Sequence, residues 1–221
     1  MQKIEIDKFT FYNADNMDIM KQYPDKYFEL AIVDPPYNIA SQQKRGVGSR
    51  IDKSGKMNNW NNATPPPEYF IELFRVSKGQ VIWGANNYIL PVTEYFCIWN
   101  KHQTVENFAS AEYAWVSPSL KTPAKVFDMT IHKHNQTKGE KIHPTMKPVD
   151  LYDWLIHNYA KPNQKILDTH LGSGSIALAI DKANKLDNMN LEFVGVELDS
   201  EYYNAALNRF RLAHAQSCLS F

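Results

Sequence analysis

Short apolar runs alternate with amphipathic stretches along the chain, and this alternation constrains the fold more than any other feature. Four apolar runs have the length and composition of buried strands: 28–33, 80–83, 165–168 and 191–196. Four stretches repeat apolar residues at helical spacing: 67–76, 148–159, 176–183 and the stretch capped by Ser200. Because strands that alternate with helices build a mostly parallel sheet covered on both faces, we expect an α/β fold.

Two further strands are expected at 95–99 and 112–116, as an antiparallel pair at one edge of the sheet. Two other stretches, 38–64 and 117–142, do not follow the alternation and are rich in basic residues. Loops of this length in compact domains are usually functional or disordered. We therefore expect a single domain over residues 1–221, with a basic loop at about 38–64 and a short insertion at about 117–142.

The 24 basic and 24 acidic side chains give a net charge of zero, which excludes a protein that binds nucleic acid by bulk charge. The charges are nevertheless unevenly distributed along the chain, because residues 1–40 hold four lysines against seven acidic residues. The loop at 38–64 instead holds five basic residues against Asp52 alone. A local positive patch is therefore expected in a chain that has no net charge.

Composition excludes several other classes of protein. An apolar fraction of 43% is too high for a disordered chain. Cys97 and Cys218 stand far apart, which excludes a disulfide framework and a four-cysteine zinc site. His132, His134 and His143 have no acid or cysteine at ligand spacing, so we expect no metal. Without an apolar run long enough for a signal peptide or a membrane span, we expect a soluble cytoplasmic protein.

A glycine motif, Asp168-Thr169-His170-Leu171-Gly172-Ser173-Gly174, lies between a predicted strand and a predicted helix. In that position the backbone can approach a ligand closely, and the helix N-terminus points N–H groups at it. Glu197 ends the next strand, where a carboxylate can accept both hydroxyls of a ribose. The motif indicates a nucleoside-containing cofactor, although a tight turn with a surface glutamate would look similar. The third glycine of a dinucleotide site and the lysine of a P-loop are absent, which disfavours NAD and ATP.

A second motif, Asp34-Pro35-Pro36-Tyr37, ends the predicted strand at 28–33, where open α/β sheets bind ligands. The two prolines stiffen the backbone, so that the Asp34 carboxylate and a proline carbonyl form a rigid pair of acceptors. Tyr37 adds a flat aromatic face. Two acceptors beside a ring can hold a flat heterocycle by its amino group, although a plain strand-ending turn would also give this motif.

These motifs resemble those of the amino-methyltransferases that methylate exocyclic amines of DNA bases with S-adenosylmethionine. Residues 34–37 match the catalytic tetrad of that family, and residues 167–175 match its cofactor glycine motif. The segment 143–148 (His-Pro-Thr-Met-Lys-Pro) matches the one beside the methionine part of the cofactor, and 195–199 match the ribose-binding strand end. The tetrad precedes the glycines, as in the circularly permuted β-type members. The resemblance spans about Phe9 to Phe210 and implies a Rossmann-like methyltransferase fold with a seven-stranded, mostly parallel sheet.

The resemblance also implies roles for individual residues. Asp34, Pro35, Pro36 and Tyr37 would be catalytic. Cofactor binding would fall to residues of the other motifs: Asp15, Thr145, Lys147, Pro148, Asp168, Thr169, His170, Gly172, Ser173, Gly174, Glu197 and Leu198. DNA contacts are expected from the two basic stretches: Lys44, Arg45, Arg50, Lys53, Lys56, Lys121, Lys125 and Lys133.

One departure from the family pattern concerns the residues after Asp168. The family usually has Pro-Phe there, whereas this chain has Thr169-His170. An aromatic contact with the cofactor is then either lost or replaced by the imidazole. Asp15, which the family often places against the adenine of the cofactor, is a weaker match because a single aspartate in a turn commonly serves only to stabilise that turn.

The resemblance predicts a site-specific DNA adenine-N6 methyltransferase that acts on a flipped-out adenine. An aspartate at the head of the tetrad favours adenine, whereas serine is commoner among cytosine-N4 enzymes. A cytosine-N4 enzyme, an RNA amino-methyltransferase and a noncatalytic nucleic-acid-binding subunit remain as alternatives. The expected partner is double-stranded DNA. The resemblance is also compatible with a homodimer and with a restriction endonuclease encoded in another chain.

Overall fold

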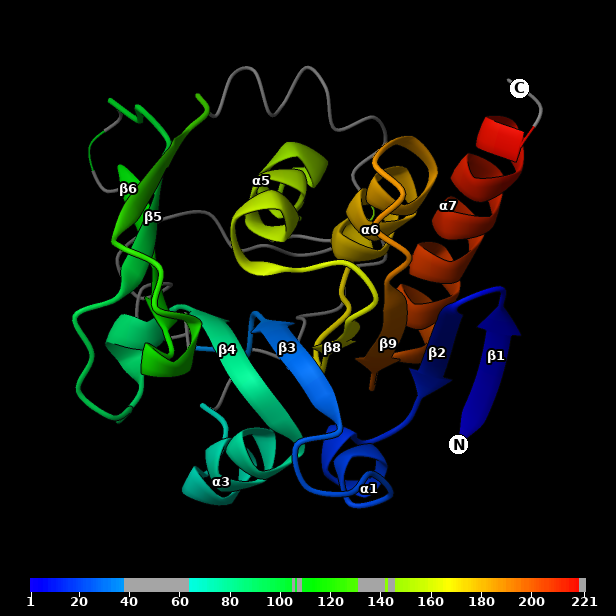
Figure 1. Cartoon of the computed structure of the whole chain (residues 1–221), viewed down its shortest axis with the longest axis horizontal. Coiled ribbons are helices and arrows are strands. Elements are labelled where there is room, and N and C mark those ends of the chain that lie inside the picture. Colours follow the sequence, from blue (N-terminus) through cyan, green and yellow to red (C-terminus); the bar gives the residue numbers. More distant parts are fainter. Residues whose placement is uncertain (38–63, 105, 107–108, 131–141, 143–145, 219–221) are drawn as a thin grey trace.

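The computed structural model describes the chain except for residues 38–63, 105, 107–108, 131–141, 143–145 and 219–221. The described residues form one nine-stranded sheet in the order β1-β2-β9-β8-β3-β4-β6-β5-β7 (Figure 1). Its strands are β1 (Gln2–Ile6), β2 (Phe9–Asn13), β3 (Phe28–Val33), β4 (Ser77–Trp83), β5 (Phe96–Asn100), β6 (Ala111–Val116), β7 (Lys125–Asp128), β8 (Lys165–Asp168) and β9 (Glu192–Glu197). The predicted α/β class is confirmed, and the two strands beyond the expected seven are β1 and β7 at the two edges.

Five neighbouring strands, β2, β9, β8, β3 and β4, run parallel. Their register aligns Asn13 with Glu197 and Asp168 with Gly195, so the ends of β2, β9 and β8 lie side by side. The expected antiparallel pair is β5 and β6, but β6 joins β4 and the edge is taken by β7. Residues 125–128 are therefore part of the sheet, which corrects the expectation that 117–142 forms only an insertion.

Helices cover both faces of the sheet, as predicted. On one face lie α1 (Asn16–Met20) and α3 (Pro67–Val76), and on the other α5 (Val149–Tyr159), α6 (Ser175–Leu186) and α7 (Ser200–Cys218), as Figure 1 shows. The short 3-10 helices η2 (Ala85–Asn87) and η3 (Pro118–Leu120) follow β4 and β6. Each face buries its own apolar cluster, one centred on α5, α6 and α7 and the other on α1 and α3.

The ends of two helices differ from expectation. Pro148 is the N-cap of α5, and the helix itself starts at Val149. The sequence predicts Ser200 as the cap of α7, but the cap is the side chain of Asp199, whose Oδ1 accepts hydrogen bonds from the backbone N–H groups of Glu201 and Tyr202 at 2.8 and 3.1 Å. No helix in the described part of the chain is long and apolar enough to cross a membrane.

Candidate active site

The carboxyl ends of the parallel strands surround a cavity of about 200 Å³. Its walls come from the segments after β2, β3, β8 and β9 and from the segment before α5. Twelve of the predicted site residues line it: Asp15, Asp34, Pro35, Pro36, Tyr37, Lys147, Thr169, His170, Gly172, Ser173, Glu197 and Leu198. Motifs separated by more than 160 residues therefore meet at one edge of the sheet, because parallel strands end on the same side.

The glycine turn after β8 is tied to the end of β9. The Glu197 carboxylate accepts a hydrogen bond from Gly172 N at 2.8 Å through Oε2 and another from Asp199 N at 3.0 Å through Oε1. Gly172 adopts a left-handed conformation with φ 52°, which a residue with a side chain rarely adopts. The turn therefore presents backbone and one oriented carboxylate to the cavity.

Three residues predicted to bind the cofactor lie in the described structure but not in the cavity wall. Asp168 is buried, and its Oδ1 accepts a hydrogen bond from His170 N at 2.9 Å, which stabilises the turn. Burial raises the pKa of Asp168 to about 8. Gly174 caps α6, where an added Cβ would stand 3.2 Å from Ala206 Cβ of α7. Pro148 caps α5, and Thr145 lies outside the described residues.

His170 lines the cavity with every ring nitrogen occupied. Its Nε2 lies 3.1 Å from Asn16 Nδ2, and its Nδ1 lies 2.9 Å from Thr169 Oγ1. Since the amide nitrogen of Asn16 can only donate, Nε2 accepts and the proton sits on Nδ1. Burial lowers the pKa of His170 to about 3, so the ring is neutral at pH 7. A neutral aromatic ring thus stands where the family usually has phenylalanine.

Asp15 also has a structural role. Its Oδ1 accepts a hydrogen bond from Met17 N at 2.8 Å, which caps α1 at the rim of the cavity. Leu198, on the opposite strand end, lines the same cavity and is 71% exposed. An acidic group and an apolar face therefore lie at the mouth.

The tetrad begins directly after β3, because two prolines cannot continue a hydrogen-bonded strand. The Tyr88 hydroxyl, which follows η2, donates to the Pro35 carbonyl at 2.6 Å and to the Pro36 carbonyl at 3.2 Å. The Tyr37 ring packs over Gly84, where an added Cβ would lie 2.6 Å from Tyr37 Cδ1. The loop after β4 therefore fixes both the carbonyls and the ring of the tetrad.

The Asp34 carboxylate belongs to a chain of alternating charges. Its Oδ2 accepts a hydrogen bond from the Nζ of Lys147, whose side chain is only 3% exposed. Lys147 Nζ also lies 3.2 Å from Glu112 Oε2, and Glu112 Oε1 is paired with Lys101. The other oxygen, Asp34 Oδ1, is buried and has no hydrogen-bond partner among the residues that the structure describes. A carboxylate that is held by one oxygen and unpaired at the other keeps the capacity to accept a further hydrogen bond.

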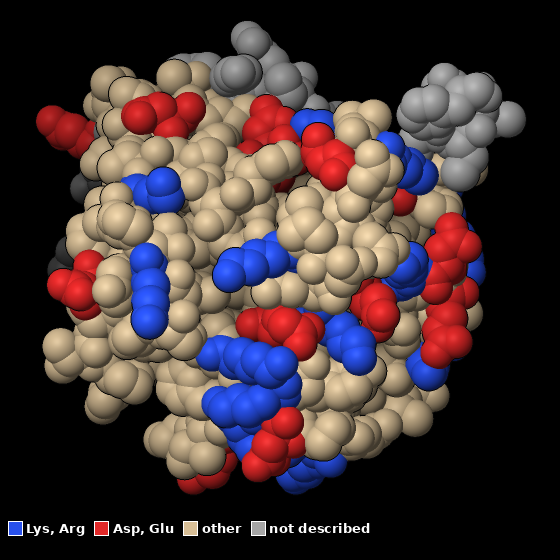
Figure 2. Space-filling view, viewed as in Figure 1, with Lys and Arg blue, Asp and Glu red and all other residues tan. Residues whose placement is uncertain are grey.

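The structure does not bring the predicted DNA-binding residues together at one place, as it does the residues of the cavity. Lys44, Arg45, Arg50, Lys53, Lys56 and Lys133 lie outside the described part of the chain. Lys125 begins β7, near the edge of the sheet. Lys121 follows η3, which hydrogen-bonds to Lys78 at the amino end of β4, and so lies away from the cavity. Figure 2 shows basic and acidic side chains interspersed over one face of the molecule.

Several residues of the site are absent from the sequence-based prediction. Those that line the cavity are Ala14, Asn16, Met146, Tyr152, Leu171 and Tyr202. Glu112, Lys101 and Tyr88 contact the tetrad or its partners and are likewise absent from the sequence-based prediction. Met146 could have been found, because it lies within the recognised segment 143–148. In the part of the chain that the structure describes, no cluster of three His, Cys, Asp or Glu could hold a metal.

The cavity offers groups that suit a nucleoside. Carboxylates at Asp15 and Glu197 can accept from hydroxyl and amino groups, and His170 and Leu198 offer flat or apolar surface. The fold and site thus define a nucleotide-type cofactor enzyme of the Rossmann-like class. The family model N6_N4_Mtase, described as DNA methylase, matches residues 69–208, which is more than half of the chain. The chain belongs to this DNA methylase family.

Curated relatives match over nearly the whole chain. The type II methyltransferase M.HinfI of Haemophilus influenzae is 26% identical over 96% of this chain and 71% of its own length. The type II methyltransferase M1.MboII of Moraxella bovis is 23% identical, over 92% of this chain and 96% of its own.

Solved structures share the fold. The complex of M1.HpyAVI with S-adenosylmethionine (SAM) is 18% identical, with a TM-score of 0.55 over 91% of this chain and 99% of that one. The cytosine-N4-specific PvuII DNA methyltransferase is 14% identical, with a TM-score of 0.58 over 91% of this chain and 86% of that one.

Proposed function

We propose that the protein is a DNA adenine-N6 methyltransferase that uses S-adenosylmethionine and serves a type II restriction-modification system. The observation that carries the proposal is the pair of acceptors in the tetrad. Within the described part of the chain Asp34 Oδ1 has no hydrogen-bond partner, and the carbonyl of the next residue, Pro35, belongs to the same rigid turn. An exocyclic amine has two N–H groups, so these two acceptors match it.

The cofactor would occupy the cavity at the ends of β8 and β9. Glu197 would hold the ribose, since both of its oxygens are already oriented by backbone N–H groups and keep further lone pairs. Gly172 would allow close approach of the backbone. Asp15 and Leu198 would contact the base, and the His170 ring would replace the family's phenylalanine. When bound, S-adenosylmethionine supplies a methyl group on a positively charged sulfur.

The target base has to leave the duplex to reach this cavity. The Tyr37 ring, braced by Gly84, would stack on it. The adenine amine is a poor nucleophile because its lone pair is delocalised into the ring. Hydrogen bonds to Asp34 Oδ1 and the Pro35 carbonyl would localise that lone pair and stabilise the positive charge that develops on nitrogen. Rate enhancement then comes from orientation and from electrostatics.

DNA contacts are assigned mainly to the basic loop at 38–64, which follows the tetrad directly in the sequence. Five basic residues in that loop would bind phosphates, so affinity for DNA should fall steeply as salt rises. The 117–142 stretch remains the candidate for base recognition. Lys121 is the weakest member of this assignment, because it lies at the amino end of β4.

Adenine is proposed over cytosine because the tetrad begins with aspartate. Cytosine-N4 methylation is the second candidate, since the structurally similar PvuII enzyme is cytosine-N4-specific and the matched family covers both. The type II role follows the names of the two relatives, and it would place a matching endonuclease in another chain.

The deciding experiment is expression in a host that lacks DNA methylation, followed by sequencing of modified bases. We expect N6-methyladenine at one short sequence and none with Asp34→Asn. N4-methylcytosine would overturn the choice of base. Methylation of RNA alone would overturn the choice of polymer. Binding of the cofactor without turnover on either polymer would indicate the noncatalytic alternative.

A further inference from the structure

Four charged side chains from four separate segments meet at the first residue of the tetrad. Asp34 follows β3, Lys147 precedes α5, Glu112 is on β6 and Lys101 follows β5. They alternate in sign: Asp34 contacts Lys147, Lys147 contacts Glu112, and Glu112 contacts Lys101. Two cations and two anions give no net charge, so the group can be buried without an uncompensated ion. We call these four residues the tetrad charge chain.

Lys147 occupies the central place in this chain. Its Nζ contacts carboxylates on both sides and lies 5.5 Å from the centroid of the Trp83 ring. A lysine this buried would lose its proton without anionic partners. Attraction to Asp34 and Glu112 overcomes the cost of burial and holds the pKa of Lys147 well above its usual range. The ammonium is therefore a permanent part of the site.

We propose that Lys147 is a positioning residue for methyl transfer: anchored by Glu112, its ammonium holds Asp34 by Oδ2, so that Oδ1 alone faces the amine of the target base. The inference rests on the proposed function, since it names what orients the acceptor in that mechanism. The resemblance implies a cofactor contact for Lys147, whereas the geometry directs its Nζ to the two carboxylates.

The fixed oxygen matters because a free carboxylate could rotate about its χ2 bond. The ion pair with Lys147 selects one orientation before the base arrives, which lowers the entropic cost of forming the reactive geometry. Glu112 is needed because it fixes the position of Lys147 in the same way as Lys147 fixes that of Asp34. With Oε1 on Lys101 and Oε2 on Lys147, it cannot turn either, and the two cations lower its pKa to about 2 despite its burial.

The charge state of Asp34 follows from the groups that surround it. Burial raises the pKa of Asp34, and Lys147 opposes that rise. Three other charged neighbours are Glu112 on β6, Lys101 after β5 and Asp168 at the end of β8. Four tyrosines also surround the group: Tyr37, Tyr69 on α3, Tyr88 and Tyr152 on α5. Burial raises the pKa of Tyr69, Tyr88 and Tyr152, so these three are neutral at pH 7. Lys147 is thus the cation that most favours the charged, accepting form of Asp34, with Lys101 adding a smaller contribution.

The test measures the single-turnover rate of methyl transfer to DNA against pH, with the cofactor saturating, for Lys147→Met and Lys147→Arg. In Lys147→Met we expect the rate at pH 7 to fall by about 100-fold or more. Its acid limb should move about 1–3 units toward higher pH, because Asp34 loses the cation that favours its charged form. Lys147→Arg should return the limb to its wild-type position, and cofactor affinity by calorimetry should stay within a few-fold in both.

Lys185→Met is the matched control, because Lys185 makes a similar ion pair with the buried Asp181 far from the cavity. It should leave the pH profile unchanged. Glu112→Gln gives a second route if Lys147→Met does not fold, and should shift the acid limb in the same direction by a smaller amount. An unshifted limb in both Lys147→Met and Glu112→Gln, or a loss accounted for by cofactor affinity alone, would overturn the proposal.

A second readout does not depend on turnover. Titration of the Asp34 carboxyl by NMR of aspartate-labelled protein, with Asp34→Asn to assign the signal, should show the midpoint rise in Lys147→Met. An unchanged midpoint contradicts the positioning role even if the enzyme is active. Conversely, a raised midpoint in a protein that methylates no nucleic acid would support the charge chain and refute the proposed function.

Discussion

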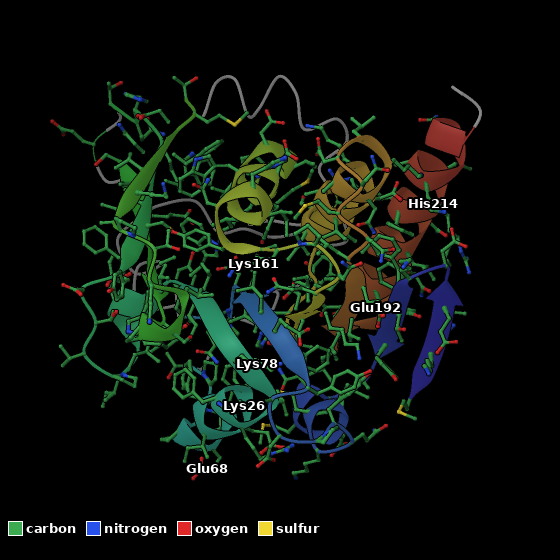
Figure 3. The ribbon with its side chains drawn as sticks, in the orientation of Figure 1. Lys26, Glu68, Lys78, Lys161, Glu192 and His214 are labelled. Carbon is green, nitrogen blue, oxygen red and sulfur yellow. The ribbon has the colours of Figure 1, made fainter. Side chains whose placement is uncertain are left out.

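Two clusters of charged side chains in this protein each hold a largely buried aspartate, and they differ in whether both oxygens of that aspartate are paired. The tetrad charge chain joins Asp34 and Glu112 to two lysines. The second cluster lies on α6 and α7, where His214, labelled in Figure 3, contacts Asp181 at 2.7 Å and Asp7 at 2.9 Å. Lys185 completes it with a 2.8 Å contact to Asp181. Both oxygens of Asp181 are paired, whereas one oxygen of Asp34 has no partner among the described residues.

The difference separates a charge cluster that stabilises from one that reacts. A buried polar atom without a partner costs free energy, so a purely structural cluster pairs every atom, as Asp181 does. Asp34 Oδ1 bears that cost at the edge of a cavity. Burial and charge alone would rank the two clusters alike, and the unpaired oxygen distinguishes them.

The largest difference between the two clusters is expected when the same substitution, aspartate to asparagine, is made in each. Asp34→Asn should lower methyl transfer by at least about 100–1000-fold, since one N–H group would then face the amine, and should leave cofactor affinity within a few-fold. Asp181→Asn should leave turnover within about two-fold but lower the free energy of unfolding by about 1–3 kcal/mol. Rate assays and urea unfolding of both variants check this. Near-normal turnover in Asp34→Asn would remove the distinction.

The next effect concerns a third carboxylate, Glu197, whose two oxygens are paired with backbone although it faces the cavity. If it binds the ribose hydroxyls, Glu197→Gln should weaken cofactor binding by about 10–100-fold, because a charge-assisted hydrogen bond is lost. Calorimetry measures the affinity. Glu192→Gln, at the exposed start of the same strand and labelled in Figure 3, is the control and should bind normally. Equal affinity in both variants would refute the assignment.

His170 sharpens the comparison, because it is a cavity residue whose polar atoms are all paired. Its pKa is about 3 in the folded protein and near 6.5 in the unfolded chain, so stability should be lost as pH falls below about 6.5. Between pH 7 and 5 this one group should account for about 2 kcal/mol. His170→Phe should remove that part of the pH dependence in urea unfolding. His102→Gln, at an exposed histidine, should retain it.

The smallest effect is expected at Tyr88, which contacts the tetrad through carbonyls and not through the carboxylate. Tyr88→Phe removes the hydroxyl that donates to both carbonyls, a loss of about 1 kcal/mol, so kcat should fall about five-fold with KM for DNA unchanged. Steady-state kinetics test this. A loss as large as that of Asp34→Asn would mean that the carbonyl, rather than the carboxylate, dominates the site.

Local patterns are enough to predict the strands and turns that carry the motifs. The strand before Asp34 and the glycine turn after Asp168 are confirmed because their prolines, glycines and apolar runs act over a few residues. The short strand β7 escapes prediction because its four residues alternate between half-buried and exposed and lie in a basic stretch. The predicted cap of α7 is wrong by one residue, since Asp199 and Ser200 are both good caps and the end of β9 decides between them.

The charge chain could not be predicted in the same way. Glu112 reaches Lys147 because β6 runs antiparallel to β4 and carries its first residues beyond Trp83. Lys101 reaches Glu112 because β5 pairs with β6 in a register that sets Trp99 opposite Glu112. Strand order and register across the sheet are long-range properties, and no local pattern in residues 101–112 records them.

The place of β3 in the sheet has a consequence for how the enzyme is made. Its Leu30 pairs with Ile166 of β8, a partner synthesised more than 130 residues later. Contacts of such long range slow folding, because a large loop has to close before they form. A nascent chain that has already exposed the tetrad still lacks β8, β9 and the turn between β8 and α6. Methylating ability should therefore arise late and all at once, after the ribosome has delivered the last third of the protein.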